Sequence, residues 1–181
     1  MKIMKRLSFC VWLIGLFTLT SVPLGFCRSQ AGTEVEYRLA GNHYLLQGNP
    51  KLAIEEYQKA ITLNSHSTAL YFNLAIALYT VGKIDAAAQA LDKLLTLDPQ
   101  DVEAQYNLAC LRFYQQDTVK AEEHFEKAKL CCPSDPRFAP LINKGLEFLK
   151  ELKDTDPSAQ SVLFFLLQQG LPPIMLTTVG S

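Results

Sequence analysis

The amino-acid sequence predicts an all-α solenoid, a stack of helix–turn–helix units that ends in further helices at its C-terminal side. Three observations predict this fold. Small and aromatic residues recur at intervals of 34 positions, glycine and proline interrupt the chain at matching places, and apolar residues keep a helical spacing after the last copy. The repeating small positions are Gly41, Ala75 and Ala109, and Ala53, Ala87 and Ala121.

Residues 1–31 predict a secretory signal peptide. Basic residues at the start are followed by an uncharged apolar run from Leu7 to about Thr20, and helix-breaking Pro23 and Gly25 come next. Ser29-Gln30-Ala31 then offers the small-x-small pattern at which such peptides are cleaved. We therefore expect an exported protein, periplasmic or associated with the cell envelope, whose mature chain begins at residue 32.

Two alternatives to cleavage stay open at this end of the chain. The segment from Leu7 to Phe26 is just long enough to cross a bilayer core of about 30 Å as an uncleaved anchor. Cys27 follows Leu24 and Gly25, as the acylated cysteine of a bacterial lipoprotein would, although bulky Phe26 stands where a small residue is expected. Either alternative would hold the protein at a membrane.

The charge of the mature chain argues against nucleic-acid binding. Four of the 17 basic residues lie in the signal segment, which leaves 13 basic against 18 acidic residues and a net charge of −5. No stripe of lysine and arginine remains, and affinity for nucleic acid rests on neutralising phosphates. We expect protein or peptide partners and no nucleic acid.

Three copies of the repeat span residues 34–67, 68–101 and 102–135. In the first copy Gly48-Asn49-Pro50 predicts the turn, because glycine tolerates a positive φ and proline suits the first turn of a helix. Val81-Gly82-Lys83 does the same in the second copy. In the third copy Gln116 replaces the glycine, and Asp117 or Thr118 is the expected cap of the next helix.

This order of small, aromatic and proline residues with a period of 34 resembles the tetratricopeptide repeat, over 102 of the 181 residues. The third copy departs most from the family pattern. Gln105 stands in the slot for tryptophan and Arg112 in the slot for tyrosine. The resemblance implies a solenoid of three repeats whose first helices line a concave groove, in which partners bind as extended or helical segments.

The helical phase gives the residues expected to line this groove. Asparagines there can hydrogen-bond a peptide backbone, and aromatic side chains offer apolar surface at low entropic cost. The expected occupant is therefore a partly apolar peptide segment. The expected lining comprises Arg38, Asn42, Leu45, Phe72, Asn73, Ile76, Tyr79, Tyr106, Asn107, Cys110 and Phe113.

Some co-chaperones of this family hold the acidic tails of chaperones with a clamp of basic residues and asparagines. Arg38, Asn42 and Asn73 match three of its five places. Glu103 and Asn107 replace the two basic residues of the third copy, and a carboxylate facing Glu103 would be repelled. The resemblance therefore does not extend to this role.

No motif indicates catalysis, and we expect neither an enzyme nor a cofactor. There is no nucleophile elbow, phosphate loop or metal-binding helix motif. Cys110, Cys131 and Cys132 remain in the mature chain as an odd number, and the histidines share no metal-ligand spacing with them. We expect the three cysteines to be small buried hydrophobes, with one exposed thiol among them, and we expect no metal site.

Residues 136–153 predict a capping helix, because leucines and phenylalanine recur on one face and charged residues on the other. Residues 157–181 predict an apolar C-terminal helix and tail with no charged residue after Asp156. The apolar run from Val162 to Leu167 is too short to span a bilayer. It either packs on the solenoid or docks on a membrane or partner.

These patterns together predict a non-enzymatic interaction scaffold of the cell envelope that binds a partly apolar peptide segment in its groove. Two alternatives remain. The same groove would serve a secretion or assembly chaperone, and Cys27 or the apolar tail would serve a membrane-associated adaptor. The patterns do not indicate an oligomeric state.

Overall fold

A computed structural model describes residues 32–156, 159–161 and 164–165 of the chain. The chain divides into two units, Met1–Gly32 and Thr33–Ser181. The predicted signal peptide, its cleavage site and Cys27 lie outside the described residues. Every helix among the described residues belongs to the second unit.

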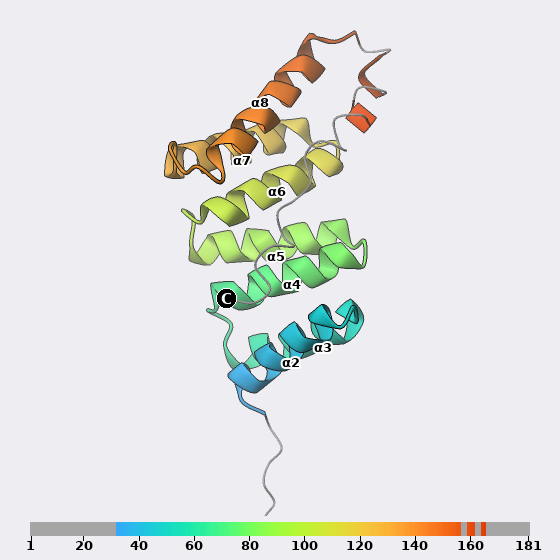
Figure 1. Ribbon diagram of the computed structural model, residues 1–181, viewed down its shortest axis with the longest axis vertical. Coiled ribbons are helices and arrows are strands. Elements are labelled where there is room, and N and C mark those ends of the chain that lie inside the picture. Colours follow the sequence, from blue (N-terminus) through green and yellow to red (C-terminus); the bar gives the residue numbers. More distant parts are fainter. Residues whose placement is uncertain (1–31, 157–158, 162–163, 166–181) are drawn as a thin grey trace, which may run out of the picture. The chain divides into compact units, whose positions relative to one another are not determined.

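Seven α-helices and no strand occur in the described part of this unit (Figure 1). The prediction of an all-α solenoid of three helix pairs and a cap is confirmed. Residues 159–161 and 164–165 are also helical, and the rest of the predicted C-terminal helix is outside the described residues. The helices are α2 (Glu34–Leu46), α3 (Pro50–Leu63), α4 (Thr68–Thr80), α5 (Ile84–Leu97), α6 (Val102–Tyr114), α7 (Thr118–Cys131) and α8 (Ala139–Asp154).

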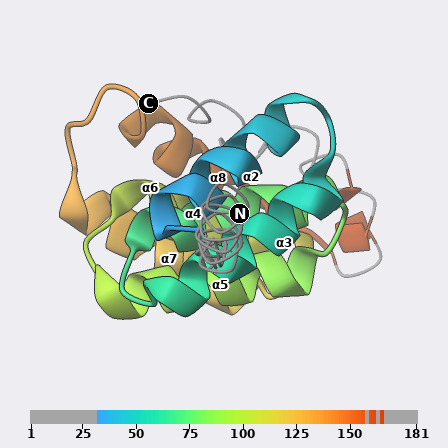
Figure 2. The ribbon, with the colours of Figure 1, turned by 90° about the horizontal axis from the view of Figure 1, so that it is seen from below.

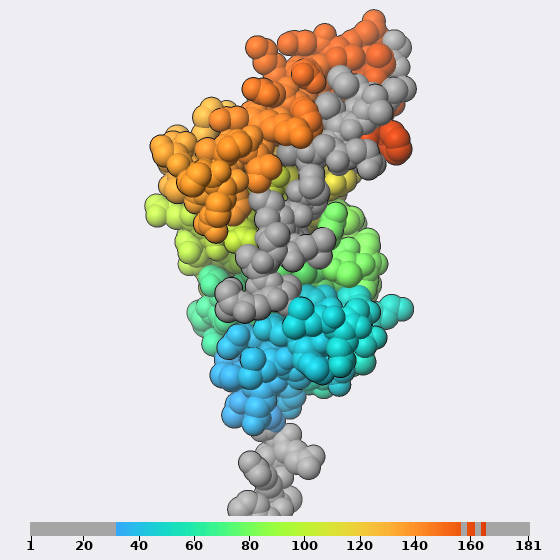
Figure 3. Space-filling view, viewed as in Figure 1, coloured from blue at the N-terminus to red at the C-terminus, as the bar shows by residue number. Residues whose placement is uncertain are grey.

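The helices stack in the order of the sequence. Each helix packs on the next one along the chain, from α2 to α8, and α2 also contacts α4. The successive colours of Figure 3 follow this order through the stack. Seen along the stack, α2, α4 and α6 lie on one side, and α3, α5 and α7 lie on the other (Figure 2). The first helices of the three repeats therefore share a face.

Side-chain caps start several of these helices. Thr33 and Glu36 form a capping box at α2, in which each side chain bonds the other residue's backbone N–H. Asp101 accepts from the N–H of Ala104 at the start of α6. Asp117, one of the two expected caps of the third turn, accepts from the N–H of Lys120.

The three turns inside the repeats share one backbone conformation. Gly48 has φ of 74°, Gly82 has 76° and Gln116 has 63°. This is the left-handed region, which glycine enters freely and other residues enter at a cost. The turn glycine predicted from sequence is confirmed in the first two repeats, and the third repeat makes the same turn with glutamine.

Small residues allow close packing inside the repeats, as the sequence predicts. Ala53, Ala87 and Ala121 are fully buried. Gly41 lies against the ring of Tyr57, where an added Cβ would come within 2.5 Å of the ring. The missing side chain of Gly41 is what makes room for Tyr57.

Helix α8 covers the end of the third repeat. It packs on α7, with Ile142 and Leu149 buried, and Gly145 lies so close to the ring of Phe125 that a Cβ would come within 2.6 Å of it. Its charged residues are exposed, and Lys153 forms an ion pair with Glu122 of α7 at 2.6 Å. The charged residues are Lys144, Glu147, Lys150, Glu151 and Lys153. The predicted capping role is confirmed by this packing.

No helix among the described residues combines the length and the apolar character that crossing a membrane requires.

Candidate partner-binding surface

The shared face of α2, α4 and α6 is the candidate binding surface, and we call it the first-helix face. Six of the residues that the sequence assigned to the groove are partly exposed on the first two of these helices. They are Arg38, Asn42 and Leu45 of α2, and Phe72, Asn73 and Tyr79 of α4. The structure therefore brings these six predicted residues to one side of the stack.

Asn42 is the polar centre of this surface. Its Oδ1 accepts a hydrogen bond from the Tyr57 hydroxyl at 2.8 Å and another from Asn73 Nδ2 at 3.1 Å. Burial raises the pKa of Tyr57 well above its usual range, so the phenol keeps its proton and donates. The pair of asparagines therefore joins the first two repeats and fixes the orientation of both amides.

Apolar side chains lie on the same two helices as this polar pair. Leu45, Phe72 and Tyr79 are partly buried and pack against the core of the first two repeats. Tyr79 also neighbours Tyr114 of α6, whose pKa is raised to about 12 by burial and, to a lesser extent, by Tyr79. Tyr114 was not among the predicted residues. Its position one helical turn after Cys110 is the signal that would have found it.

The structure corrects the expectation for the other five residues. Ile76, Tyr106, Asn107, Cys110 and Phe113 were expected to line the groove, yet all five are fully buried. As they lie in this structure they pack inside the protein and present no surface to a partner. Four of them belong to α6, so the correction concerns the third repeat above all.

The third-repeat residues are buried by elements on their C-terminal side. Tyr106 packs against Phe125 of α7 and Phe138 before α8, with ring centroids 5.8 and 6.1 Å away. Phe113 packs against Phe164, with centroids 4.7 Å apart. Burial also raises the pKa of the Cys110 thiol to about 12, so this cysteine is not a reactive thiolate.

Four enclosed polar atoms of α6 lack hydrogen-bond partners, and two of them are side-chain oxygens of Glu103 and Asn107. Oε1 of Glu103 and Oδ1 of Asn107 are both enclosed and accept no hydrogen bond. Burial, followed by the charge of Asp101, raises the pKa of Glu103, while Arg137 lowers it. The two positions at which the third copy departs from the clamp pattern therefore hold unused acceptors.

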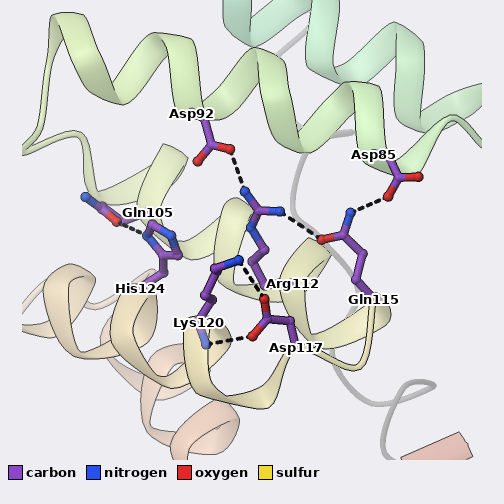
Figure 4. A network of polar contacts seen from close by, with 8 residues as sticks. All are labelled: Asp85, Asp92, Gln105, Arg112, Gln115, Asp117, Lys120 and His124. Carbon is purple, nitrogen blue, oxygen red and sulfur yellow. Dashed lines mark hydrogen bonds and ion pairs between the residues drawn. The ribbon is translucent and has the colours of Figure 1, made fainter.

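A polar network joins the second and third repeats where α5, α6 and α7 meet (Figure 4). Arg112 Nη2 lies 2.5 Å from Asp92 Oδ2, and Nη1 donates to Gln115 Oε1 at 3.1 Å. Gln115 in turn donates to Asp85 Oδ1 at 2.6 Å. Arg112, which replaces the family's tyrosine, therefore links α6 to α5 through hydrogen bonds where the earlier repeats have Tyr44 and Leu78.

The glutamine in the tryptophan slot, which is the second departure of the third copy from the family pattern, also forms hydrogen bonds. Gln105, in the tryptophan slot, donates from Nε2 to the carbonyl of Pro99 at 3.0 Å and accepts at Oε1 from His124 Nδ1 at 2.7 Å. Burial lowers the pKa of His124. Polar contacts thus replace aromatic packing, and both substitutions have a structural explanation.

The described residues contain no group of three or more side chains placed to hold a metal ion. Cys110, Cys131 and Cys132 are free thiols, with Cys110 buried and Cys131 exposed.

Comparison with known families supports the resemblance to the tetratricopeptide repeat. A family model described as tetratricopeptide repeat matches residues 72–136, and a second, described as TPR repeat, matches residues 41–82. The chain carries tetratricopeptide repeats. Both matches fall on the helix pairs α2 to α7, which are the helices that build the first-helix face.

Relatives of these tetratricopeptide repeats occur in proteins of different size. The chain is 30% identical over 87 residues to the TPR repeat-containing protein MJ1428 of Methanocaldococcus jannaschii, a match over 48% of this chain and 15% of that protein. The chain thus spans a small part of that relative. Among solved structures, the first TPR domain of Spaghetti (RPAP3), bound to the HSP90 peptide SRMEEVD, has a TM-score of 0.61 and 20% identity, and covers 68% of this chain and 94% of that domain.

A second solved structure is the Yersinia enterocolitica type III secretion chaperone SycD in complex with a peptide of the translocator YopD. It has a TM-score of 0.62 and 16% identity, and the match covers 68% of this chain and 98% of that chain. At these identities the likeness extends to the fold of the repeats.

Proposed function

We propose that this protein is a non-enzymatic interaction module that binds a partly apolar peptide segment of another protein on its first-helix face. The observation that carries the proposal is that Leu45, Phe72 and Tyr79 are partly exposed on the same two helices as the hydrogen-bonded pair Asn42 and Asn73. Apolar side chains supply affinity when they are buried by a ligand, and the amides meet the backbone of an extended chain. Arg38 is the one cation among these six residues and already pairs with Glu34 at 3.6 Å.

The comparisons support this proposal at the level of the fold. Two of the solved tetratricopeptide-repeat structures that resemble this chain contain a bound peptide, from HSP90 in one and from the translocator YopD in the other. This chain keeps the same arrangement of paired helices. Glu103 and the buried Asn107 stand where a clamp for acidic tails would need basic residues, so we propose an apolar segment and not an acidic tail.

Substitution of Phe72 and Tyr79 by alanine tests the proposed surface. A binding partner is first obtained by placing a photo-crosslinking amino acid at position 79 and applying the protein to an envelope fraction. Alanine at both positions should weaken binding of that partner by about thirtyfold or more, because aromatic anchors often contribute 2 kcal/mol at an interface. Binding of the partner by the parent protein should depend only weakly on salt, since burial and not charge supplies the affinity.

Leu63 provides the matched control. It is an exposed apolar residue at the end of α3 (53% exposed), and α3 lies on the other side of the stack from α2, α4 and α6 (Figure 2). Its replacement by alanine, or the crosslinker placed there, should leave the partner unaffected. Normal binding by a folded protein with both Phe72 and Tyr79 replaced would show that the first-helix face is not the site.

We also propose that the module works outside the cytoplasm. Residues 1–31 support this through their basic start, apolar run and Ser29-Gln30-Ala31. The mature N-terminus, read by intact mass or N-terminal sequencing, distinguishes the possibilities. Gly32 at the start indicates cleavage, an acylated Cys27 indicates a lipoprotein, and Met1 indicates an uncleaved anchor.

A secretion or assembly chaperone is the second candidate function, and the likeness to the SycD complex favours it. A chaperone and a scaffold would use the same surface but differ in what they do to the partner. A chaperone should keep an aggregation-prone partner soluble in a light-scattering assay, whereas a scaffold should bind a folded partner without this effect. The membrane-associated adaptor is tested separately by alanine substitutions in the apolar tail.

A further inference from the structure

Helix α2 carries a narrow stripe of exposed apolar side chains. The stripe consists of Val35, Leu39 and Leu46, which are 47%, 55% and 69% exposed. Because an α-helix has about 3.6 residues per turn, spacings of four and seven residues bring all three side chains to one side of it. Tyr37 and Tyr44 lie on the opposite side of the helix and pack against the core. The stripe therefore points away from the core of the protein.

The stripe is confined to α2. A segment bound along the whole first-helix face would meet the equivalent positions on all three first helices, but the other two helices carry no leucine, isoleucine or valine there. The equivalent residues are Ala69, Asn73 and Thr80 on α4, and Glu103, Asn107 and Tyr114 on α6. Single exposed leucines are ordinary, whereas apolar residues aligned along one helix form the kind of seam on which two helices pair. The stripe therefore indicates a contact made by α2 alone.

The free end of the repeat array does not explain the stripe. Leu70 and Ala77 of α4 are buried, and their equivalents on α2 are Glu36 and His43, which are exposed. The first unit of an array needs polar residues of this kind at the end that no repeat covers. The three stripe residues are not among these positions, so capping of the array leaves them unaccounted for.

The stripe matches itself when two copies of α2 lie antiparallel. Positions 35 and 46, and positions 39 and 42, are equidistant from the middle of the helix. Val35 then faces Leu46 of the second copy, and Leu39 faces Asn42 of the second copy. A surface that is its own complement is what a two-fold symmetric interface requires.

Polar residues beside the stripe fit the same arrangement. Glu36 lies in the first turn of α2 and His43 in the last turn, so that each Glu36 comes across from His43 of the second copy. Gln47 Nε2 donates to His43 Nε2 at 2.9 Å, which leaves Nδ1–H of the histidine to donate to that carboxylate. The N-terminus of each helix also meets the C-terminus of the other, as the helix dipoles favour.

We propose that α2 is a self-association surface on which two copies of this chain pair as an antiparallel, two-fold symmetric dimer. The inference is independent of the proposed function. Burial of the stripe residues of both copies supplies the driving force. A single pair of helices buries less area than the interface of a permanent dimer, so the dimer forms reversibly. It also covers Asn42, so that a second copy and a partner segment compete for α2.

Sedimentation equilibrium of the protein as isolated measures this association. The parent should show a reversible monomer–dimer equilibrium with a roughly micromolar dissociation constant. Leu39→Glu should raise that constant about a hundredfold or more, because the symmetric interface loses two buried leucines and gains two carboxylates. Leu63→Glu is the matched control, since Leu63 on α3 is 53% exposed against 55% for Leu39, and it should leave the constant unchanged. Thermal unfolding of each variant shows that the fold is retained.

A photo-crosslinking amino acid at position 46 tests the arrangement of the two copies. In a mixture of ¹⁵N-labelled and unlabelled chains, crosslinked peptides of mixed isotope should join position 46 to the residues around Val35. A protein that stays monomeric up to millimolar concentrations overturns the inference, as does a dimer that is unaffected by Leu39→Glu. Mixed crosslinks from position 46 to position 46, or to another helix, would contradict the antiparallel pairing. None of these outcomes decides partner binding, which the variants at Phe72 and Tyr79 test separately.

Discussion

Position 116 carries glutamine in a backbone conformation that glycine adopts at the two equivalent turns. The φ angles of Gly48, Gly82 and Gln116 are 74°, 76° and 63°, so the repeat requires the same turn whichever residue is present. Left-handed backbone crowds the Cβ of any L-residue against its own chain. The third repeat therefore tolerates a local strain that the first two avoid.

Gln116→Gly should stabilise the protein by about 0.5–1 kcal/mol. Removing the side chain from a left-handed conformation stabilises the folded state by roughly 1–2 kcal/mol. The greater conformational entropy of glycine in the unfolded chain offsets part of this gain. The measurement is the free energy of unfolding in urea. Gly82→Ala provides the reverse change, and because no atom lies within 4 Å of the added Cβ, its cost of about 1 kcal/mol reports the backbone alone. Equal stability of Gln116→Gly and the parent would mean that the turn is not strained.

At the scale of the elements, the third repeat is joined to its neighbours by polar contacts where the family pattern has aromatic ones. Gln105 of α6 links the carbonyl of Pro99 to His124 of α7, and Arg112 links α6 to Asp92 of α5 (Figure 4). These contacts depend on the protonation of the groups that make them. The packing of α6 against α7 should therefore respond to pH through His124.

Acidification should destabilise the protein through His124. Burial, followed by the charge of Lys127, lowers the pKa of His124 below its ordinary 6.5, while Glu123 and Asp92 act weakly in the other direction. The folded protein thus binds fewer protons than the unfolded chain, so the contribution of His124 is complete above pH 6.5 and is lost as the pH falls towards the lowered pKa. Urea midpoints measured from about pH 7.5 down to about pH 5 should fall more steeply for the parent than for His124→Gln.

Glu103 contributes with the opposite sign, because its raised pKa favours the folded state at lower pH. Glu103 is present in both the parent and His124→Gln, so its contribution cancels when their pH profiles are compared. Identical pH profiles for the parent and His124→Gln would exclude the histidine as the source.

At the scale of the whole molecule, the repeat register and the cap were predictable because their signals are local. The period, the turn glycines and the spacing of apolar residues in α8 all lie within short stretches of sequence. The burial of Tyr106, Cys110 and Phe113 was not predictable in this way. It depends on Phe138, on α8 and on Phe164, whose contacts cross from one element to another. Helical phase places a side chain on a face but does not say what will cover that face.

The same limit applies to the first-helix face. Its polar centre follows from the repeat, since Asn42 and Asn73 lie on successive first helices, but the hydrogen bond between them depends on how α2 and α4 pack. The buried oxygens of Glu103 and Asn107 belong to residues that the sequence marked only as a departure from a family pattern. The lack of donors emerged when the surroundings of both side chains were in place.

The two phenylalanines at 164 and 165 decide between the roles that the sequence left open for the apolar tail. Phe164 is 9% exposed and stacks near Phe113, whereas its neighbour Phe165 is 62% exposed. If the segment from Val162 to Leu167 packs on the solenoid, Phe164→Ala should lower the free energy of unfolding by about 2 kcal/mol or more, and Phe165→Ala should change it by less than about 0.5 kcal/mol. Urea unfolding monitored by circular dichroism measures both.

The same pair of variants tests the membrane-associated adaptor. Binding to vesicles of mixed zwitterionic and anionic lipid, followed by flotation, should be absent for a tail that only packs on the solenoid. A tail used for docking would instead give flotation that Phe165→Ala weakens, because the exposed ring is the one available to a lipid surface. The packing role is contradicted if Phe164→Ala leaves the stability unchanged while Phe165→Ala abolishes flotation. The tail would then bind the membrane, and Phe164 would not be the residue that covers Phe113.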